Sequence, residues 1–291
     1  FFPLSAKVLF CQVNIDLDGY WKFKIRNNPE WKNPEISESN WDNIVLHNDA
    51  WESLGYKYNG YAWYRKSFIL PAKPGKATKN NEFIIIDNLN IRDKGQVFLN
   101  GDSLEQFIIS NKSEIVYQSQ PYSPKILIPY NSDVFQWDKT NVLAVQVNHP
   151  IHAFKTTGFI GGGIVNGHPV LRDATINDLI DISCSLPVKA VAGKRVPIKM
   201  TFKNIAPANQ RIQIELNLTE AISGNVIQSK KREHTCTASG SSSINEQFTI
   251  PASGDYYLGY ECNITGKNDL LRKKQLIAYK PVADFEKQFN A

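Results

Sequence analysis

Residues 62–71 read AWYRKSFILP, residues 83–90 read FIIIDNLN and residues 96–101 read QVFLNG. All three stretches are rich in aromatic and β-branched residues, and each ends in a proline, asparagine or glycine that stops a strand or forms a turn. Three such strands within about forty residues favour an antiparallel β-sandwich or jelly roll. The fold class that we predict is therefore all-β.

The composition is that of a folded globular protein with two domains. The chain has 291 residues, of which 42% are hydrophobic and 21% charged. All six tryptophans lie at or before Trp137, which is the first sign that the two halves differ. The net charge of +5 comes from scattered lysines and arginines without a basic stripe, so we expect no nucleic-acid partner.

Two further motifs flank the opening stretches. Residues 41–44 read WDNI and are followed by a second tryptophan, Trp51, while residues 141–148 read NVLAVQVN and alternate like a strand buried on one face. In this order, the motifs resemble the sugar-binding N-terminal domain of glycoside hydrolase family 2, the β-galactosidase and β-glucuronidase group. In that family the loop that corresponds to residues 26–53 folds across the sandwich, so Trp41 and Trp51 are expected to be packing residues.

The second half of the chain predicts an immunoglobulin-like sandwich. Seven short strand patterns separated by Gly, Pro, Asn and Ser turns cover residues 181–186, 196–204, 211–218, 226–235, 243–250, 256–263 and 270–279. The resemblance implies the same order of domains. We expect a galactose-binding-like jelly-roll sandwich over 14–174, an immunoglobulin-like sandwich over 175–283 and a tail over 284–291.

The first thirteen residues leave two interpretations open. Residues 1–12 read FFPLSAKVLFCQ, which is typical of the end of a secretory signal peptide with cleavage near Cys11. Lys7 inside this apolar run is instead typical of an ordinary first strand. We expect an extracytoplasmic location, secreted or periplasmic. No segment is apolar over the eighteen or so residues that would indicate a transmembrane helix, so no such span is expected.

Several features that could bind metals or cofactors have simpler structural explanations. The four cysteines are Cys11, Cys184, Cys236 and Cys262, and they lack metal-ligand spacing. We expect them to be small buried thiols. A disulfide between two of the last three is an alternative that the sequence leaves open. The glycines in residues 158–164, GFIGGGI, lack the Lys-Ser/Thr of a phosphate loop and predict positive-φ turns or close packing. No cofactor is implied.

Two weaker metal patterns also have simpler structural explanations. His149 and His152 have no third ligand nearby, and we expect histidines in a solvent-facing loop. Asp and Asn residues within 87–93 could offer oxygen ligands to calcium, but turn formation is the favoured interpretation. We therefore predict no metal site.

The sequence offers no catalytic pair for a glycosidase, which needs two carboxylates flanking the scissile bond. In the resembling family these are two glutamates on a (β/α)₈ barrel that follows the immunoglobulin-like domain, and no glutamate here matches them. Residues 165–168 read VNGH where the family has an aromatic residue and an arginine facing the catalytic domain. The resemblance thus covers the non-catalytic part of the family, and whether the chain acts as an enzyme is left open.

Six residues are our candidates for glycan contact: Tyr58, Tyr61, Trp63, Arg65, Asn100 and His149. Pyranose rings pack on aromatic side chains, and arginine donates a fork of hydrogen bonds to hydroxyls. Tyrosines that merely cover a sheet edge are the competing explanation. Two hypotheses follow: a glycan-binding or scaffolding module of carbohydrate metabolism, or a protein-interaction module that docks on a separate catalytic hydrolase subunit without binding sugar.

Overall fold

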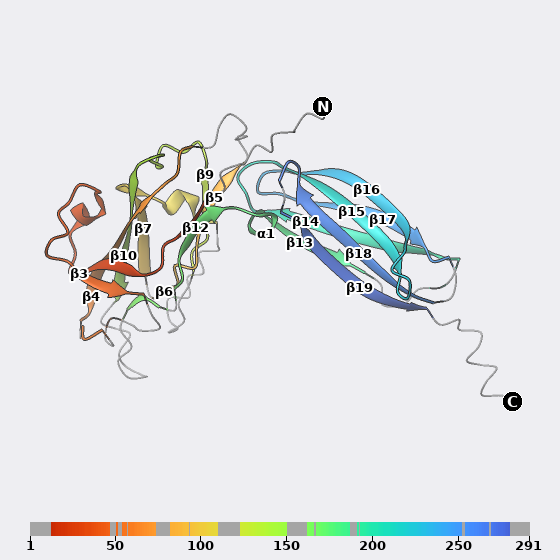
Figure 1. Ribbon diagram of the computed structural model, residues 1–291, viewed down its shortest axis with the longest axis horizontal. Coiled ribbons are helices and arrows are strands. Elements are labelled where there is room, and N and C mark those ends of the chain that lie inside the picture. The colour runs from red at the N-terminus through yellow and green to blue at the C-terminus, as the bar shows by residue number, and fades with distance from the viewer. Residues whose placement is uncertain are drawn as a thin grey trace, which may run out of the picture. The chain divides into compact units, whose positions relative to one another are not determined.

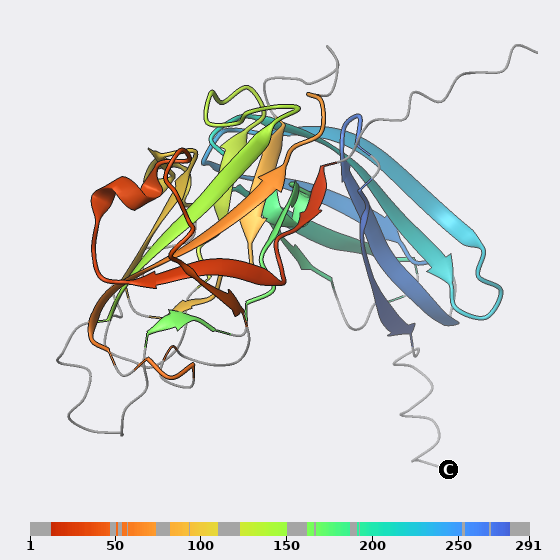
Figure 2. The same cartoon turned by 60° about the vertical axis from the view of Figure 1, so that its left-hand side comes forward.

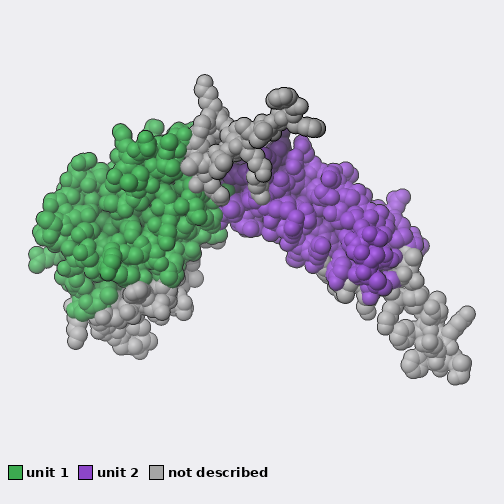
Figure 3. All heavy atoms as spheres, viewed as in Figure 1, with its two compact units in different colours: residues 1–174 green, residues 175–291 purple. Residues whose placement is uncertain are grey.

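The computed structural model describes residues 13–46, 51, 54–56, 58–73, 82–92, 94–109, 123–149, 162–165, 167–186, 191, 193–251, 254–267 and 269–279. The chain divides into two compact units, Phe1–Ala174 and Thr175–Ala291 (Figure 3). Every strand belongs to an antiparallel sheet, and the described helices are single turns (Figure 1). The all-β prediction is confirmed.

The first unit is built from two main sheets and one small one. A four-stranded sheet has the order β1 (Asn14–Asp16), β12 (Val170–Asp173), β5 (Phe83–Asp87), β9 (Ile126–Pro129). A six-stranded sheet has the order β3 (Asp42–Val45), β2 (Tyr20–Ile25), β4 (Gly60–Ile69), β10 (Thr140–His149), β7 (Lys94–Leu99), β8 (Asp102–Ser103). The small sheet pairs β11 (Gly163–Ile164) with β6 (Ile91–Arg92), and η2 (Glu105–Phe107) is a single turn.

The core of this unit lies between the two main sheets. Leu143, Val145 and Val147 of β10 are fully buried in it, as the alternation of residues 141–148 predicts. Ile84 and Ile86 of β5 reach the same core from the other sheet. Fully buried apolar side chains of this size each contribute roughly 1.5–3 kcal/mol, so the sandwich is held mainly by this layer.

The outer face of the six-stranded sheet is covered by residues 26–41, which include the turn η1 (Pro29–Lys32). We call these residues the cover. Figure 2 shows η1 outside the sheet formed by β2, β4 and β10. Trp31 and Trp41 of the cover pack edge to face at 5.1 Å between ring centroids, in a cluster with Trp63, Phe98 and Ala144. Trp41 and Trp51 are both buried, so their predicted packing role is confirmed.

Among its described residues, the second unit has seven strands in two sheets. One sheet has the order β13 (Ile180–Ser185), β14 (Arg195–Asn204), β17 (Ser241–Thr249), and the other β16 (Val226–Cys236), β15 (Gln210–Glu220), β18 (Gly254–Ile264), β19 (Leu271–Tyr279). The turn α1 (Ile176–Leu179) precedes β13. Alternate residues of β14 and β15 are buried, as expected for strands that present one face to a sandwich core.

The three cysteines of the second unit, Cys184, Cys236 and Cys262, are free thiols. Cys236 and Cys262 are buried and Cys184 is half-buried, as we expected for small core residues. Burial raises the pKa of Cys184 to about 11 and that of Cys262 to about 12, which keeps these thiols protonated at neutral pH. Within the described residues, no helix is long and apolar enough to cross a membrane.

Candidate functional site

The six candidate residues fall into three places in the first unit. Tyr61 pairs with Asn148 and Gly60 with His149, so Tyr58, Tyr61 and His149 gather where β4 begins and β10 ends. We call this the loop end of the sandwich. Trp63 and Arg65 lie further along β4, on the face beneath the cover. Asn100 sits at the opposite end, where its amide N–H donates to the carbonyl of Val142 near the start of β10.

Trp51 holds the loop end together. Its ring packs edge to face against His149 at 5.8 Å and lies 6.2 Å from the ring of Tyr58. Its backbone N–H donates to the carbonyl of Gly162 at 3.1 Å. A Cβ on Gly162 would lie 2.9 Å from both the His149 Cβ and the Trp51 ring, so the expected close packing of the glycine cluster is confirmed at this position.

His149 is only 2% exposed, so its predicted solvent-facing position is wrong. Strand β10 continues through this residue and places the imidazole against Trp51, whereas the sequence suggested a loop. His152 lies outside the described residues. Tyr58 and Tyr61 are half-buried, so the tyrosine rings are the parts of this group that a ligand can reach.

Arg65 is 1% exposed and its guanidinium is occupied by the cover. It donates to the Trp31 carbonyl at 2.5 Å, to the Asn33 carbonyl at 3.0 Å and to the Glu38 carboxylate at 2.6 Å. Trp63, also 1% exposed, stacks on Phe98. In this arrangement both side chains fasten the cover to the sheet, and glycan contact by either remains a prediction that requires the cover to open.

The side chain of Asn100 is equally committed to the fold. Its Nδ2 donates to the Val134 carbonyl and to Asn141 Oδ1, each at 2.8 Å, and its Oδ1 accepts from the Val142 N–H at 2.9 Å. The residue adopts φ = +53°, a conformation that asparagine tolerates better than most residues. Asn100 therefore ties the β7–β8 turn to β10, and its predicted ligand contact remains untested.

The suspected calcium pattern has the geometry of turns. Asn88 and Asn90 have φ = +60° and +39°, and Asp87 Oδ1 accepts the Asn88 N–H at 2.9 Å. Asp87 also lies 3.5 Å from the guanidinium of Arg172. The described part of the chain contains no group of three or more His, Cys, Asp or Glu side chains that could hold a metal ion.

Two ionisable pairs in the first unit were not visible in the sequence, because their partners are far apart along the chain. Tyr56 donates its hydroxyl to Asp42 at 2.6 Å, and burial together with this carboxylate raises the pKa of Tyr56 to about 12. His168 lies 2.8 Å from Asp18, and this hydrogen bond lowers the pKa of Asp18 below its ordinary value. Tyr56 therefore stays neutral and Asp18 ionised at neutral pH.

The all-β fold of this chain is similar to part of several larger glycoside hydrolases of solved structure. A β-glucuronidase 2 of Bacteroides uniformis is similar over 92% of this chain and 32% of its own, with 18% identity and a TM-score of 0.53. A glycosyl hydrolase family 2 member of Bacteroides cellulosilyticus is similar over 91% of this chain and 36% of its own, with 13% identity and a TM-score of 0.51. A β-glucuronidase of Parabacteroides merdae is similar over 92% of this chain and 36% of its own, with 14% identity and a TM-score of 0.51.

At these identities the likeness establishes the fold of the two units. The chain spans about a third of the length of these enzymes. No family model matches the sequence, and no curated protein matches it either.

Proposed function

We propose that this chain is a non-catalytic module of carbohydrate metabolism, like the N-terminal sandwich pair of a family 2 glycoside hydrolase. The observation that carries the proposal is the likeness in fold to part of enzymes named as glycoside hydrolases, which covers 92% of this chain in the first case. The sequence motifs point to the same family independently. The module supports and positions a glycan or a catalytic partner, and the reaction itself is carried out elsewhere.

The glycan contact of this proposal lies at the loop end of the first unit. Tyr58 and Tyr61 present half-buried rings on which a sugar can stack, and the buried Trp51, itself packed on His149, packs against Tyr58. Because a half-buried ring is already restrained, it loses little conformational entropy on binding.

Isothermal titration of the whole chain against β-glucuronides, β-galactosides and β-mannosides tests this contact. We expect binding of at least one class, weakened about fivefold by Tyr58→Ala, as typical for the loss of one aromatic contact. The matched control is Tyr20→Ala, a 72% exposed tyrosine on the same unit but away from the loop end. The glycan contact is contradicted if none of the three classes gives a heat of binding. It is also contradicted if Tyr58→Ala and Tyr20→Ala weaken the affinity equally.

A second candidate function is docking on a separate catalytic hydrolase subunit without sugar binding. It is favoured by the commitment of Trp63, Arg65 and Asn100 to the fold, which leaves fewer side chains for a ligand. Co-purification of the tagged chain from its source, followed by identification of the partner, tests this. A stoichiometric hydrolase partner together with silent titrations supports docking, whereas a chain that purifies alone and binds a glycan excludes it.

We also propose that the protein works outside the cytoplasm, in the periplasm or after secretion. The support is the apolar stretch of residues 1–12 and the kind of protein that the fold resembles. Cell fractionation with detection of the mature N-terminus tests it. Recovery in the cytoplasmic fraction with residues 1–12 retained would contradict it.

A further inference from the structure

The four-stranded sheet of the second unit has a polar outer face with a hollow in its middle. The register places Asn217 of β15, Gly259 of β18 and Lys274 of β19 in one row across the sheet. The neighbouring rows contain Thr219 with Tyr257, and Glu261 with Arg272. These residues line a hollow of about 180 Å³. It lies wholly within the second unit and is distinct from the loop end.

Gly259 creates this hollow. The residue lies in the interior of a central strand, where glycine costs roughly 0.5–1 kcal/mol relative to alanine. A Cβ at this position would lie 2.7 Å from the carbonyl of Lys273 and 3.0 Å from the Cγ of Lys274, so β19 approaches too closely for any side chain. The floor of the hollow at this position is therefore backbone, while its walls are side chains such as Tyr257, Arg272 and Lys274.

Of the described charged side chains around the hollow, one cation is not part of an ion pair. Glu261 is paired with Arg272 at 2.9 Å, and Glu215 with Lys231 at 3.1 Å. Lys274 has no ion-pair partner among the residues that the structure describes. An anion at the hollow would meet this free ammonium group and the remaining donors of Arg272.

The hollow also offers an apolar ring and an unsatisfied acceptor. Tyr257 is 38% exposed and borders the hollow, which Val226 also lines. Asn217 donates to Glu215 at 3.4 Å, but its Oδ1 is buried without a hydrogen-bond donor among the described atoms. A buried acceptor of this kind costs roughly 1–3 kcal/mol, which a ligand hydroxyl can recover.

We propose that this hollow binds a sugar ring that carries an anionic substituent, a carboxylate or a sulfate. The ring packs on Tyr257, a turn of the Asn217 amide brings its Oδ1 to a ring hydroxyl that donates to it, and the anionic group lies between Lys274 and Arg272. The combination of an aromatic face with a few converging polar groups is what saccharide sites use. The unpaired lysine sets the preference for a charged sugar over a neutral one.

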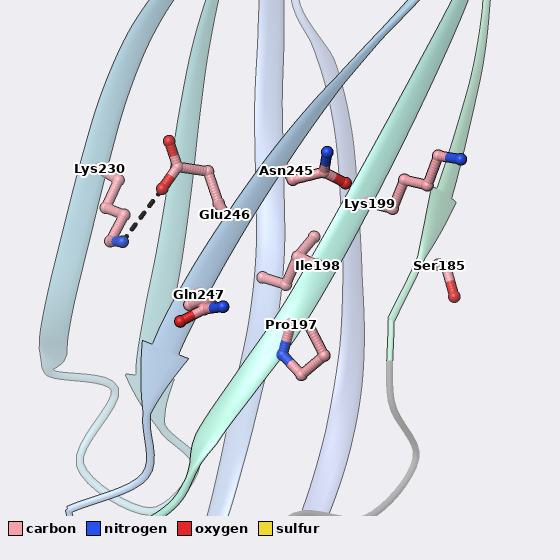
Figure 4. Close-up of a pocket in the computed structure, with 8 residues that line it drawn as sticks. All are labelled: Ser185, Pro197, Ile198, Lys199, Lys230, Asn245, Glu246 and Gln247. Carbon is pink, nitrogen blue, oxygen red and sulfur yellow. Dashed lines mark hydrogen bonds and ion pairs between the residues drawn. The ribbon is translucent and has the colours of Figure 1, made fainter.

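A larger hollow in the same unit lacks this combination. It measures about 470 Å³ and is lined by Ser185, Pro197, Ile198, Lys199, Lys230, Asn245, Glu246 and Gln247 (Figure 4). None of these side chains is aromatic, and Lys230 is already paired with Glu246 at 3.0 Å. It offers a sugar no ring to stack on.

The test is isothermal titration of the whole chain with a galacturonic acid trimer, a sulfated galactose oligomer and a neutral galactose trimer. We expect at least one anionic oligomer to bind, and the neutral trimer to bind at least about threefold more weakly, a factor typical of one exposed charge contact. The affinity should fall as salt is raised from low to physiological concentration. Because all six tryptophans lie in the first unit, tryptophan emission should not change on binding.

Two variants locate the site. Tyr257→Ala should weaken binding about fivefold through the lost ring contact, and Lys274→Ala about threefold through the lost charge. Lys203→Ala, on the outer face of the other sheet, is the matched control and should leave the affinity unchanged; thermal unfolding checks that all three variants fold. No binding of either anionic oligomer, equal affinity for the neutral trimer, or an unchanged Lys274→Ala affinity overturns the proposal. Tyr58→Ala separates this site from the loop end, since it should leave anionic binding intact.

Discussion

The two units stabilise their sheets in different ways. In the first unit, the outer face of the six-stranded sheet is sealed by the cover, with Arg65 buried beneath it and bonded to the Glu38 carboxylate. In the second unit the outer faces of the sheets are open to solvent, and polar side chains join the two sheets along one side. These contacts pair Gln228 with Thr249, Lys230 and Arg232 with Glu246, and His234 with Ser242.

The difference separates side chains that are structural from side chains that remain available. Beneath the cover, the Arg65 guanidinium is engaged in hydrogen bonds and the Trp63 ring in packing, so both side chains stabilise the fold. On the open faces of the second unit, each charge can be exchanged with solvent or with a ligand. We therefore expect large stability effects from single changes under the cover and small ones between β16 and β17.

The strongest test of this contrast is Arg65→Ala. Removing the guanidinium leaves the Glu38 carboxylate and the carbonyls of Trp31 and Asn33 without their donor. We expect the free energy of unfolding of the first unit to fall by about 3 kcal/mol, as when one partner of a buried pair is deleted. Urea unfolding followed by tryptophan emission measures it, because all six tryptophans lie in this unit.

The matched control is Arg232→Ala, whose side chain is 52% exposed beside Glu246. Its effect on the free energy of unfolding of the second unit should stay below about 1 kcal/mol, and far-UV circular dichroism follows it because that unit contains no tryptophan. If Arg65→Ala and Arg232→Ala lowered the free energy of unfolding by similar amounts, the bonds between Arg65 and the cover would contribute no more to stability than an exposed ion pair.

The second largest effect is expected at Asn100. Asn100→Ala removes three hydrogen bonds and keeps a side chain at φ = +53°, so we expect the free energy of unfolding of the first unit to fall by about 2 kcal/mol. Asn100→Gly removes the same bonds but relieves the backbone, and should lose less. If the two variants lose equally, the backbone conformation carries no cost. A loss below about 0.5 kcal/mol for both would contradict a structural role for the side chain.

The fold could be predicted from local patterns, whereas the site could not. Strand β10 was recognisable because Leu143, Val145 and Val147 alternate with more polar or smaller residues. Residues 62–65 of β4 are instead buried on both faces, so the sequence gives no alternation to show which side chains are available. The cover that buries Arg65 comes from residues about thirty positions earlier, and periodicity holds no information about such a contact.

The same limit applies to the hollow in the second unit. Asn217, Gly259 and Lys274 come from three strands and meet only through the register of the sheet. A glycine inside a strand pattern signals close backbone approach, and Gly259 was the one local clue available in the sequence. The buried position of His149 was missed for a related reason, because the length of β10 depends on its pairing with β4.

A smaller, pH-dependent effect is expected for the Glu246 contacts (Figure 4). Burial raises the pKa of Glu246, but hydrogen bonds from Lys230 and Arg232 outweigh it and hold the pKa below its ordinary value of 4.5. The contribution to stability is therefore fully present above about pH 4.5 and is lost as the pH falls through the lowered pKa. Glu246→Gln should cost about 1 kcal/mol at pH 7 and almost nothing at pH 3. Hydrogen exchange in β16 and β17 between these pH values measures it, and a loss that persists at pH 3 would assign the effect to packing.

The smallest effect is expected for Asp18→Asn in the first unit. The hydrogen bond with His168, together with the Gly19 N–H, outweighs burial and lowers the pKa of Asp18, so its contribution also disappears as the pH falls below about 4. His168 is 79% exposed, and solvent screening limits the gain to about 0.3 kcal/mol. Urea unfolding followed by tryptophan emission at pH 3 and pH 6 compares the variant directly with Arg65→Ala. If Asp18→Asn cost as much as Arg65→Ala, exposed ion pairs rather than the cover would set the stability of the first unit.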